Sequence, residues 1–243
     1  MQQTLYHMLR TAIRAEHPVA LATVVRGDDI GAQTLIRPDM APLSMLTDAV
    51  LVETIQRDAV RMLNDEAQGT VTYGAREIFI ETYPPPATII MIGAVHISIA
   101  LTAFAAQLGF RTVVVDARAA FATGERFGHA NELIHAWPDE ALVGRLHPNT
   151  AVVVLTHDPK LDDPALMVAL PSAARYVGAL GSKKTHAERV VRLRDAGLTA
   201  AEIDRLHAPI GLNIGGRTPG EIALSIMAQI VAVRNGKHAE TRP

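Results

Sequence analysis

Hydrophobic and polar positions alternate over the first third of the chain, as they do in half-buried strands. A turn at 27–29, with one glycine and two aspartates, joins the first two of these runs. Helical spacing of apolar residues predicts helices over 1–16 and 44–66. The predicted strands are 18–26, 32–37, 70–74 and 77–83.

From residue 87 onward the apolar runs are longer and alternate with helical segments. This order is typical of a parallel sheet whose strands are buried on both faces and joined by crossover helices. The sequence therefore predicts an α/β protein with a Rossmann-like sheet in its C-terminal part. The expected strands lie near 88–92, 112–116, 151–156 and 175–179.

Three consecutive prolines, Pro84 to Pro86, separate the two patterns. Proline cannot continue a sheet and favours stiff, extended backbone. We therefore expect a small N-terminal α/β domain over 1–83 and a Rossmann-like domain over 87–236. The prolines at 84–86 form the linker between them, and 237–243 is a tail.

Two helix starts in the C-terminal part carry capping signals. Asp163 followed by Pro164 resembles an N-cap with proline at the first helical position. Thr218 and Glu221 have the spacing of a capping box, in which each side chain accepts a hydrogen bond from the backbone at the other position. We expect a helix to begin at each place.

The stretch 88–116 has the order of a nucleotide-binding unit, with a glycine turn at Gly93, His96 at the start of the following helix, and Asp116 at the end of the second strand. A helix that follows a strand directly points free N–H groups at an anion. An acidic residue in the position of Asp116 commonly binds a ribose. Val95 and Ser98 replace the second and third glycines of G-x-G-x-x-G, so the pattern indicates the fold more strongly than a dinucleotide.

Further candidates follow the other strands, where ligands bind in open α/β sheets. The segment 156–163 holds a histidine beside several aspartates, which suits proton transfer or metal binding but also helix capping. The segment 178–184 runs from a strand into a hydroxyl and two lysines, which suits a phosphate cradle or a solvated helix start. The glycine-rich loop 209–217 indicates backbone close to a ligand or to a neighbouring strand. The candidate ligand-binding residues are Gly93, His96, Asp116, Arg118, His157, Asp158, Gly181, Ser182, Lys183, Asn213 and Gly215.

Composition narrows the classes of function. The chain has 49% apolar and 20% charged residues and a formal charge of −2, as in ordinary globular proteins, and it lacks the basic footprint of a nucleic-acid binder. It contains no cysteine, which excludes disulfides, cysteine nucleophiles and thiolate metal sites and fits a cytoplasmic protein. The uncharged stretch 87–110 is long enough to span a bilayer, but Gly93 divides it into a strand and a helix, so we expect no membrane span. We expect no metal site.

Six segments of the C-terminal part together resemble the XdhC/CoxI family of xanthine dehydrogenase accessory proteins. They are IGAVHI at 92–97, VDAR at 115–118, TGERF at 123–127, LTHD at 155–158, YVGALGS at 176–182 and HAPIGLNIG at 207–215. The run ALATVVR at 20–26 resembles the family's first strand. The resemblance implies a two-domain, often dimeric, cytoplasmic protein that binds molybdenum cofactor, protects it during sulfuration and helps to load it into a molybdenum hydroxylase.

The chain departs from the family in the small domain. Many members carry a Gly-Cys-Val-Glu-like motif, whereas 49–53 reads AVLVE and keeps Glu53 but has no cysteine. Sulfur chemistry that requires a cysteine is therefore unavailable to this chain alone, and a cysteine desulfurase becomes a candidate partner beside the apo-enzyme.

The leading hypothesis is a non-catalytic maturation factor with a molybdopterin-type cofactor over the strand ends. The alternative is an NAD(P)-dependent oxidoreductase that uses Gly93 and Asp116, with His157 or His96 in proton transfer. Val95 and the lack of a compact catalytic constellation disfavour this alternative, and the pattern names no catalytic residue. A third hypothesis is a scaffold or regulator that has lost its ligand.

Overall fold

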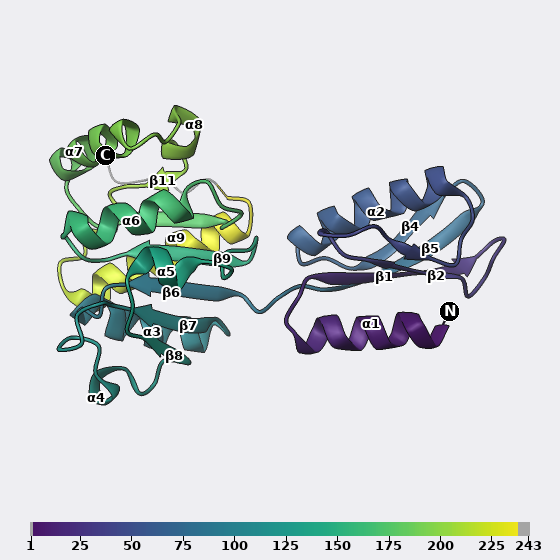
Figure 1. Ribbon diagram of the computed structural model, residues 1–243, viewed down its shortest axis with the longest axis horizontal. Helices are drawn as coiled ribbons and strands as arrows, with labels where there is room; N and C mark the ends of the chain where they lie inside the picture. The colour runs from purple at the N-terminus through teal and green to yellow at the C-terminus, as the bar shows by residue number, and fades with distance from the viewer. Residues whose placement is uncertain (1, 238–243) are drawn as a thin grey trace. The chain divides into compact units, whose positions relative to one another are not determined.

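The computed structural model describes residues 2–237 and forms two compact units that divide between Pro86 and Ala87 (Figure 1). Each unit has its own hydrophobic core. The predicted tail at 237–243 lies outside the described residues from 238 onward.

The N-terminal unit is an antiparallel sheet in the order β3-β2-β1-β5-β4, with one helix on each face (Figure 1). Alternate residues of β1 point to opposite faces, so Ala20 and Ala22 pack in the core under α2 while Val19 packs in the core under α1. The elements are α1 (Gln2–Arg14), β1 (Val19–Arg26), β2 (Gln33–Ile36), β3 (Leu43–Ser44), α2 (Ala49–Asn64), β4 (Gly69–Tyr73) and β5 (Arg76–Tyr83).

The helix predicted over 44–66 begins later than expected. Residues Leu43 and Ser44 pair with β2 as the short strand β3, and the helix starts after Asp48, whose side chain accepts a hydrogen bond from the Leu51 N–H. The capping bond supplies a partner for one of the N–H groups that a helix start leaves free, which fixes the boundary there.

The C-terminal unit is a six-stranded parallel sheet in the order β11-β10-β9-β6-β7-β8. If the strands β6 to β11 are numbered 1 to 6, the order read from β8 is 3-2-1-4-5-6, as in a Rossmann fold. The order reverses between β6 and β9. The strands are β6 (Thr88–Ile92), β7 (Arg111–Val115), β8 (Glu132–Ile134), β9 (Thr150–Val154), β10 (Tyr176–Ala179) and β11 (Leu206–His207). The helices are α3 (His96–Gln107), α4 (Gly124–Phe127), α5 (Pro138–Leu142), α6 (Pro159–Ala169), α7 (Lys183–Asp195), α8 (Ala200–Ile203) and α9 (Pro219–Arg234).

The sheet is buried on both faces. Ile89 and Met91 pack with α3 and α9, whereas Ile90 and Ile92 pack with α5 and α6 on the opposite face. This double burial explains the continuous apolar run of β6. The stretch that could suggest a membrane span is divided into β6 and α3, and none of the helices within 2–237 is long and apolar enough to cross a bilayer.

One predicted helix start is confirmed and the other is wrong. Thr218 and Glu221 form the expected capping box at α9. The helix predicted to begin at Asp163 begins earlier, after Asp158, with Pro159 in the first turn and Pro164 inside the helix. Asp163 instead pairs with Arg192 of α7, 2.6 Å from Oδ2 to Nε.

Candidate functional site

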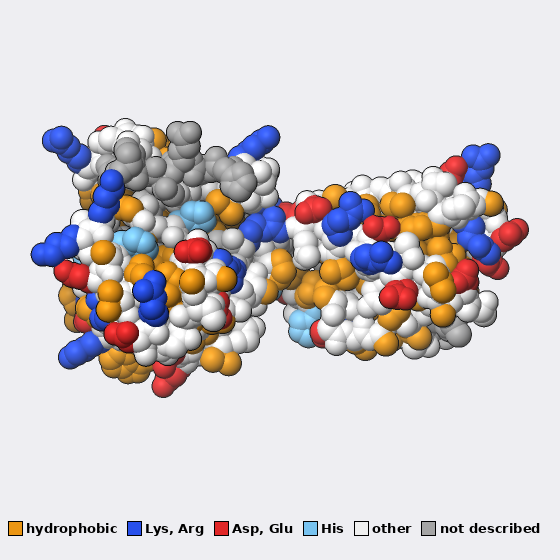
Figure 2. Space-filling model, turned by 90° about the horizontal axis from the view of Figure 1, so that it is seen from above, with side chains coloured by type: hydrophobic (Ala, Val, Ile, Leu, Met, Phe, Trp, Pro, Cys, Tyr) orange, Lys and Arg blue, Asp and Glu red, His pale blue; other side chains and the backbone are white. Residues whose placement is uncertain are grey.

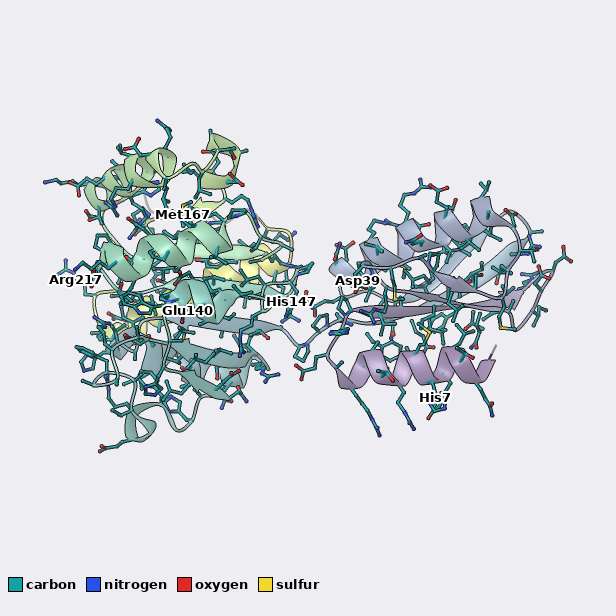
Figure 3. The ribbon with its side chains drawn as sticks, in the orientation of Figure 1. His7, Asp39, Glu140, His147, Met167 and Arg217 are labelled. Atoms are coloured by element: carbon teal, nitrogen blue, oxygen red, sulfur yellow. The ribbon has the colours of Figure 1, made fainter. Side chains whose placement is uncertain are left out.

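The candidate residues gather at the carboxyl ends of the parallel strands. In Figure 3, Arg217 lies at this end of the C-terminal unit, and His147, which precedes β9, lies at the other end. The turns after β6 and β9 meet where the strand order reverses, which is the place at which open α/β sheets bind ligands. The structure thus brings the candidates from different parts of the sequence to one edge of the sheet.

Gly93 joins β6 to α3 in a backbone conformation that favours glycine, with φ at +109°. A Cβ built on it would lie 2.6 Å from Cγ2 of Thr156 in the neighbouring turn. Ser98, at the third glycine position, is buried and donates its hydroxyl hydrogen bond to the Gly93 carbonyl. Val95 is the N-cap of α3 and gives it no side-chain cap, while His96 in the first turn is exposed.

Asp116 follows β7 and is buried, and both of its carboxylate oxygens are occupied within the protein. Arg118 donates to it from Nε and Nη2, at 2.9 and 2.8 Å, and from its backbone N–H at 2.9 Å. The N–H of Ala94, in the glycine turn, donates to Oδ2 at 2.8 Å. Burial raises the pKa of Asp116, but the hydrogen bonds outweigh it and hold the pKa below its usual value. In this arrangement Asp116 ties two turns together and has no oxygen left over for a ribose.

The lowered pKa of Asp116 predicts how stability depends on pH. A carboxyl group whose pKa is depressed by folding stabilises the protein above its unfolded pKa, about 3.9, and this contribution is lost as the pH falls. We expect Asp116→Asn to lower the free energy of unfolding by about 1–3 kcal/mol at pH 7 and by less at pH 3.5, because charge-assisted bonds are lost. Urea unfolding at both pH values measures this, with Asp195→Asn, at the exposed end of α7, as the control for the change of charge. A loss that is equal at both pH values contradicts the prediction.

The turn after β9 holds Thr156, His157 and Asp158 in different settings. Thr156 is buried, and its hydroxyl accepts from the Asp158 N–H and donates to Asp162. Asp158 caps α6 by accepting from the Lys160 N–H at 3.0 Å, so capping explains its place. His157 is exposed at the same edge. No group of three or more His, Asp or Glu residues in the described part of the chain is arranged to hold a metal ion.

The turn after β10 leads into α7 as expected. Gly181 has φ at +148°, and a Cβ on it would lie 3.2 Å from the Thr185 side chain. Ser182 is the N-cap of α7 and accepts a hydrogen bond from the Thr185 N–H, so its hydroxyl serves the helix. Lys183 and Lys184 are exposed in the first turn, beside the N–H groups that a helix start leaves without intrahelical partners.

A buried ion pair that the sequence pattern did not single out lies beneath these two turns. Nη2 of Arg189 is 3.2 Å from Oδ2 of Asp162 and also donates to the Leu180 carbonyl, and both charged side chains are at most 3% exposed. Burial raises the pKa of Asp162 despite its bonds to Thr156 and Arg189. Nε and Nη1 of Arg189 are buried and, among the described residues, make no hydrogen bond. Two donors of this buried guanidinium are thus without a hydrogen-bond partner near the start of α7.

The glycine-rich loop supplies Asn213 and Gly215, both exposed. The loop is anchored at its start, where the Gly211 N–H donates to the Gln229 side chain at 2.8 Å. The Tyr176 hydroxyl donates to the same oxygen at 2.6 Å. The anchor holds the loop against β10 and α9, which supports the expectation of backbone close to a neighbouring element.

The assembled edge is rich in groups that bind anions. Figure 2 shows several Lys and Arg side chains projecting from the end of the C-terminal unit at the left of the view. Arg118 is held in place by Asp116, Lys183 stands at a helix start, and the buried Arg189 lies below. Such a surface suits a ligand with phosphate groups.

Comparison with known proteins identifies the fold and the family. The model of the XdhC Rossmann domain matches residues 89–230, more than half of the chain. The chain is 33% identical over 158 residues to a probable xanthine dehydrogenase subunit of Bacillus subtilis, a match that covers 65% of this chain and 46% of that protein. It is 29% identical over 136 residues to the molybdenum cofactor insertion chaperone PaoD of Escherichia coli, a match that covers 53% of this chain and 42% of that one.

A solved structure shares the fold over nearly the whole chain. The crystal structure of a xanthine dehydrogenase from Bacillus halodurans superposes with a TM-score of 0.56 at 21% identity and covers 98% of each chain. This likeness supports the fold alone. The chain spans less than half the length of the curated relatives that it matches.

Proposed function

The chain belongs to the XdhC family, and we propose from this that it is an accessory protein that binds molybdenum cofactor and helps to load it into a molybdenum hydroxylase. PaoD, a relative, is named as a molybdenum cofactor insertion chaperone, and a second relative is named as a xanthine dehydrogenase subunit. The observation that carries the proposal is the edge at the carboxyl ends of the C-terminal sheet, to which Arg118, Lys183 and the buried Arg189 each contribute a cationic side chain.

The groups at this edge fit a phosphate-bearing cofactor. Phosphate is favoured at the start of α7 by free N–H groups, the helix dipole and Lys183. The buried Arg189, which is paired with Asp162, has two further N–H groups without partners near this helix start. Gly93 and Gly181 keep two turns free of side chains, and Asn213 and Gly215 lie on the exposed part of the loop between β11 and α9. His96, His157, Asp158 and Asn213 supply polar groups for a pterin.

The proposed partners follow from what the chain lacks. With no cysteine among 243 residues, the protein has no thiolate that could carry sulfur to the cofactor. Sulfuration would then need a second protein, such as a cysteine desulfurase, and delivery would need the apo-enzyme. A homodimer in the cytoplasm remains our prediction for the form in which the protein acts.

The alternative of an NAD(P)-dependent oxidoreductase has less support at the first glycine turn. The acidic side chain that would hold a ribose is bound by Arg118, and the N–H of Ala94, which a pyrophosphate would need, donates to Asp116. Val95 also places a β-branched side chain where the fingerprint has glycine.

The test is to purify the protein without oxygen, identify released small molecules by mass spectrometry, and titrate the apo-protein with molybdenum cofactor, NAD and NADP by calorimetry. We expect the cofactor to bind more tightly than either dinucleotide. Micromolar binding of NAD with no pterin binding would overturn the proposal.

Replacing Lys183 tests the phosphate cradle. Loss of one charge-assisted hydrogen bond should weaken cofactor binding by roughly ten- to a hundredfold in Lys183→Ala. Ser182→Ala should weaken binding through loss of the helix cap, and it should also lower stability by about 1 kcal/mol. The matched control is Arg194→Ala, which removes the same charge from the exposed last turn of α7. Equal affinities in Lys183→Ala, Arg194→Ala and the parent would show that the lysines are only a solvated helix start.

A further inference from the structure

The edge strand β4 of the N-terminal sheet lacks the features that keep sheet edges from pairing. Protected edge strands are short, carry charged side chains or proline, or are interrupted by a bulge. β4 has five residues, with the sequence GTVTY, and pairs with β5 in an unbroken register. It contains no charge and no proline, and three of its residues are β-branched. Its outer side is therefore suited to pairing with a further strand.

The other sheet edges in the described part of the chain are protected by their length. β3 and β11 have two residues each, and β8 has three. Glu132 of β8 is also charged and forms an ion pair with Arg145 at 2.9 Å. Among residues 2–237, β4 is thus the one edge strand that is both long enough to pair and uncharged.

The turn that joins β4 to β5 determines which backbone groups face outward. Tyr73 and Arg76 flank a two-residue turn, so they form a hydrogen-bonded pair. Bonded and non-bonded pairs alternate along an antiparallel ladder, so Val71 is the next bonded residue of β4, while Thr70 and Thr72 lie at non-bonded positions. The N–H and C=O groups of both threonines therefore point away from β5. Among the described residues, nothing outside the hairpin hydrogen-bonds to either of them.

These outward groups are complementary to those of a second copy of the same strand. In an antiparallel pair of β4 strands with a twofold axis at Val71, Thr70 of each copy lies opposite Thr72 of the other. Both threonine pairs can then exchange their N–H and C=O groups in full, as a hydrogen-bonded pair does. Threonine beside threonine on one face and valine beside valine on the other are favourable cross-strand contacts.

The side chains around β4 favour the same arrangement. Val71 and Tyr73 are half-buried against the core under α2, and a strand added next to them would cover more of both. The acidic residues Asp65 and Glu66 come shortly before β4. A parallel pair would bring these acidic ends together, whereas an antiparallel pair sets them at opposite ends of the joint. Apolar burial and charge thus both support antiparallel pairing.

We propose that two copies of this chain pair antiparallel through β4, with Val71 at the twofold axis, so that their N-terminal sheets form one continuous sheet. The inference goes beyond the proposed function, because it concerns the N-terminal unit and needs no cofactor. It gives the predicted homodimer a surface, which is defined by Thr70, Val71 and Thr72. Each copy presents the same strand to the other, so the pairing closes at two copies.

A single cysteine tests the register, because the chain has none of its own. Val71 faces its counterpart in a non-hydrogen-bonded pair, in which the Cα atoms are about 4.5 Å apart and within disulfide range. We expect Val71→Cys to form a disulfide-linked dimer under mild oxidation, measured by non-reducing electrophoresis. Thr70→Cys is the matched control, because Thr70 lies diagonally from its own counterpart, at roughly 7–8 Å, and should not cross-link.

Sedimentation velocity over a range of protein concentrations measures the pairing itself. We expect the parent to dimerise at micromolar concentration and Thr72→Pro to dimerise at least tenfold more weakly, because each copy loses one outward donor. Proline there should leave the hairpin folded, since the Thr72 N–H does not bind β5. Circular dichroism checks the folding of each variant.

Charge pairs test the same joint without proline. Thr70→Lys with Thr72→Lys should be monomeric, and so should the matching pair of glutamate substitutions, because like charges then lie opposite one another. An equimolar mixture of the two variants should dimerise. Thr4→Lys with Thr11→Lys, on the exposed face of α1, is the control for the change of charge and should dimerise like the parent.

The outcomes separate this proposal from the proposed function. A parent that stays monomeric far above micromolar concentration, a dimer that survives the lysine pair, or equal cross-linking of Val71→Cys and Thr70→Cys overturns the pairing. A monomeric parent that binds a strand of another protein at β4 also overturns it. If the pairing is confirmed but neither the parent nor the monomeric variant binds molybdenum cofactor in calorimetry, the pairing stands and the proposed function falls.

Discussion

Replacing Arg189 with methionine should destabilise the protein by about 3–5 kcal/mol at neutral pH, because the change leaves the buried Asp162 carboxylate without its cation. Methionine fills much of the same volume, so the loss reports the charge rather than a cavity. Chemical denaturation of parent and variant measures the effect. The same pair holds α6 and α7 together beneath the ligand edge, so we also expect weaker binding at the start of α7.

The loss should shrink as the pH falls. Burial already raises the pKa of Asp162, and removal of Arg189 raises it further. A carboxyl group whose pKa is raised by folding favours the native state at low pH and destabilises it as the pH rises. The difference in the free energy of unfolding between the parent and Arg189→Met should therefore be smaller at pH 5 than at pH 7.

Two controls isolate the buried charge. Arg192 forms the neighbouring pair with Asp163 between the same two helices, but its side chain is 37% exposed. We expect Arg192→Met to cost less than about 1 kcal/mol. Adding Asp162→Asn to Arg189→Met should recover much of the loss, because no buried charge remains. Equal costs for the two arginine variants would show that burial of the pair does not decide its contribution.

The sequence pattern predicted the longer elements because their burial is simple. β6, β7 and β9 are buried on both faces and appear as apolar runs, and β1 alternates between two cores. The elements that it missed are short. β3 and β11 have two residues each, and β8 has three half-buried ones, so none shows a periodicity. Each of them is defined by its pairing with a neighbouring strand and not by a pattern of its own.

The misplaced helix start has a local cause. Asp158-Pro159 and Asp163-Pro164 are the same capping signal repeated five residues apart. The structure uses the first as the cap, since Asp158 accepts from the Lys160 N–H. Pro164 then removes only one backbone bond near the start of α6, which the helix tolerates through its contacts with the core.

The sequence pattern predicted that the candidate residues lie at the carboxyl ends of the strands, but not which side chains pair there. Strand ends and glycine turns pointed to Gly93, Asp116 and Gly181. The pattern could not show that Asp116 binds Arg118, because side-chain partners depend on rotamers and neighbouring loops. Arg189 was missed since arginine is usually exposed. The available signal was its spacing, four residues before the buried Leu193 and thus on the inner face of α7.

Replacing Gly93 with alanine should affect both stability and binding. The residue has φ at +109°, which costs an L-residue about 1–3 kcal/mol, and the new Cβ would approach Cγ2 of Thr156 to 2.6 Å, which adds a similar overpacking cost. Relief of the clash would move Thr156, and with it the turns after β6 and β9 between which the ligand is expected to lie. We therefore expect a loss of about 2–4 kcal/mol in the free energy of unfolding, together with weaker cofactor binding at temperatures where the variant is folded.

The matched control is Gly109→Ala between α3 and β7, where φ is +76° and a Cβ would meet nothing within 4 Å. It carries the conformational cost without the clash, so it should lose about 1 kcal/mol. Thermal unfolding and calorimetric titration of both variants separate strain from contact. If the two variants lose the same stability, or if Gly93→Ala binds the cofactor like the parent, the close approach of Gly93 to Thr156 is not what shapes the site. That result would move the ligand away from the place where the strand order reverses and toward the start of α7.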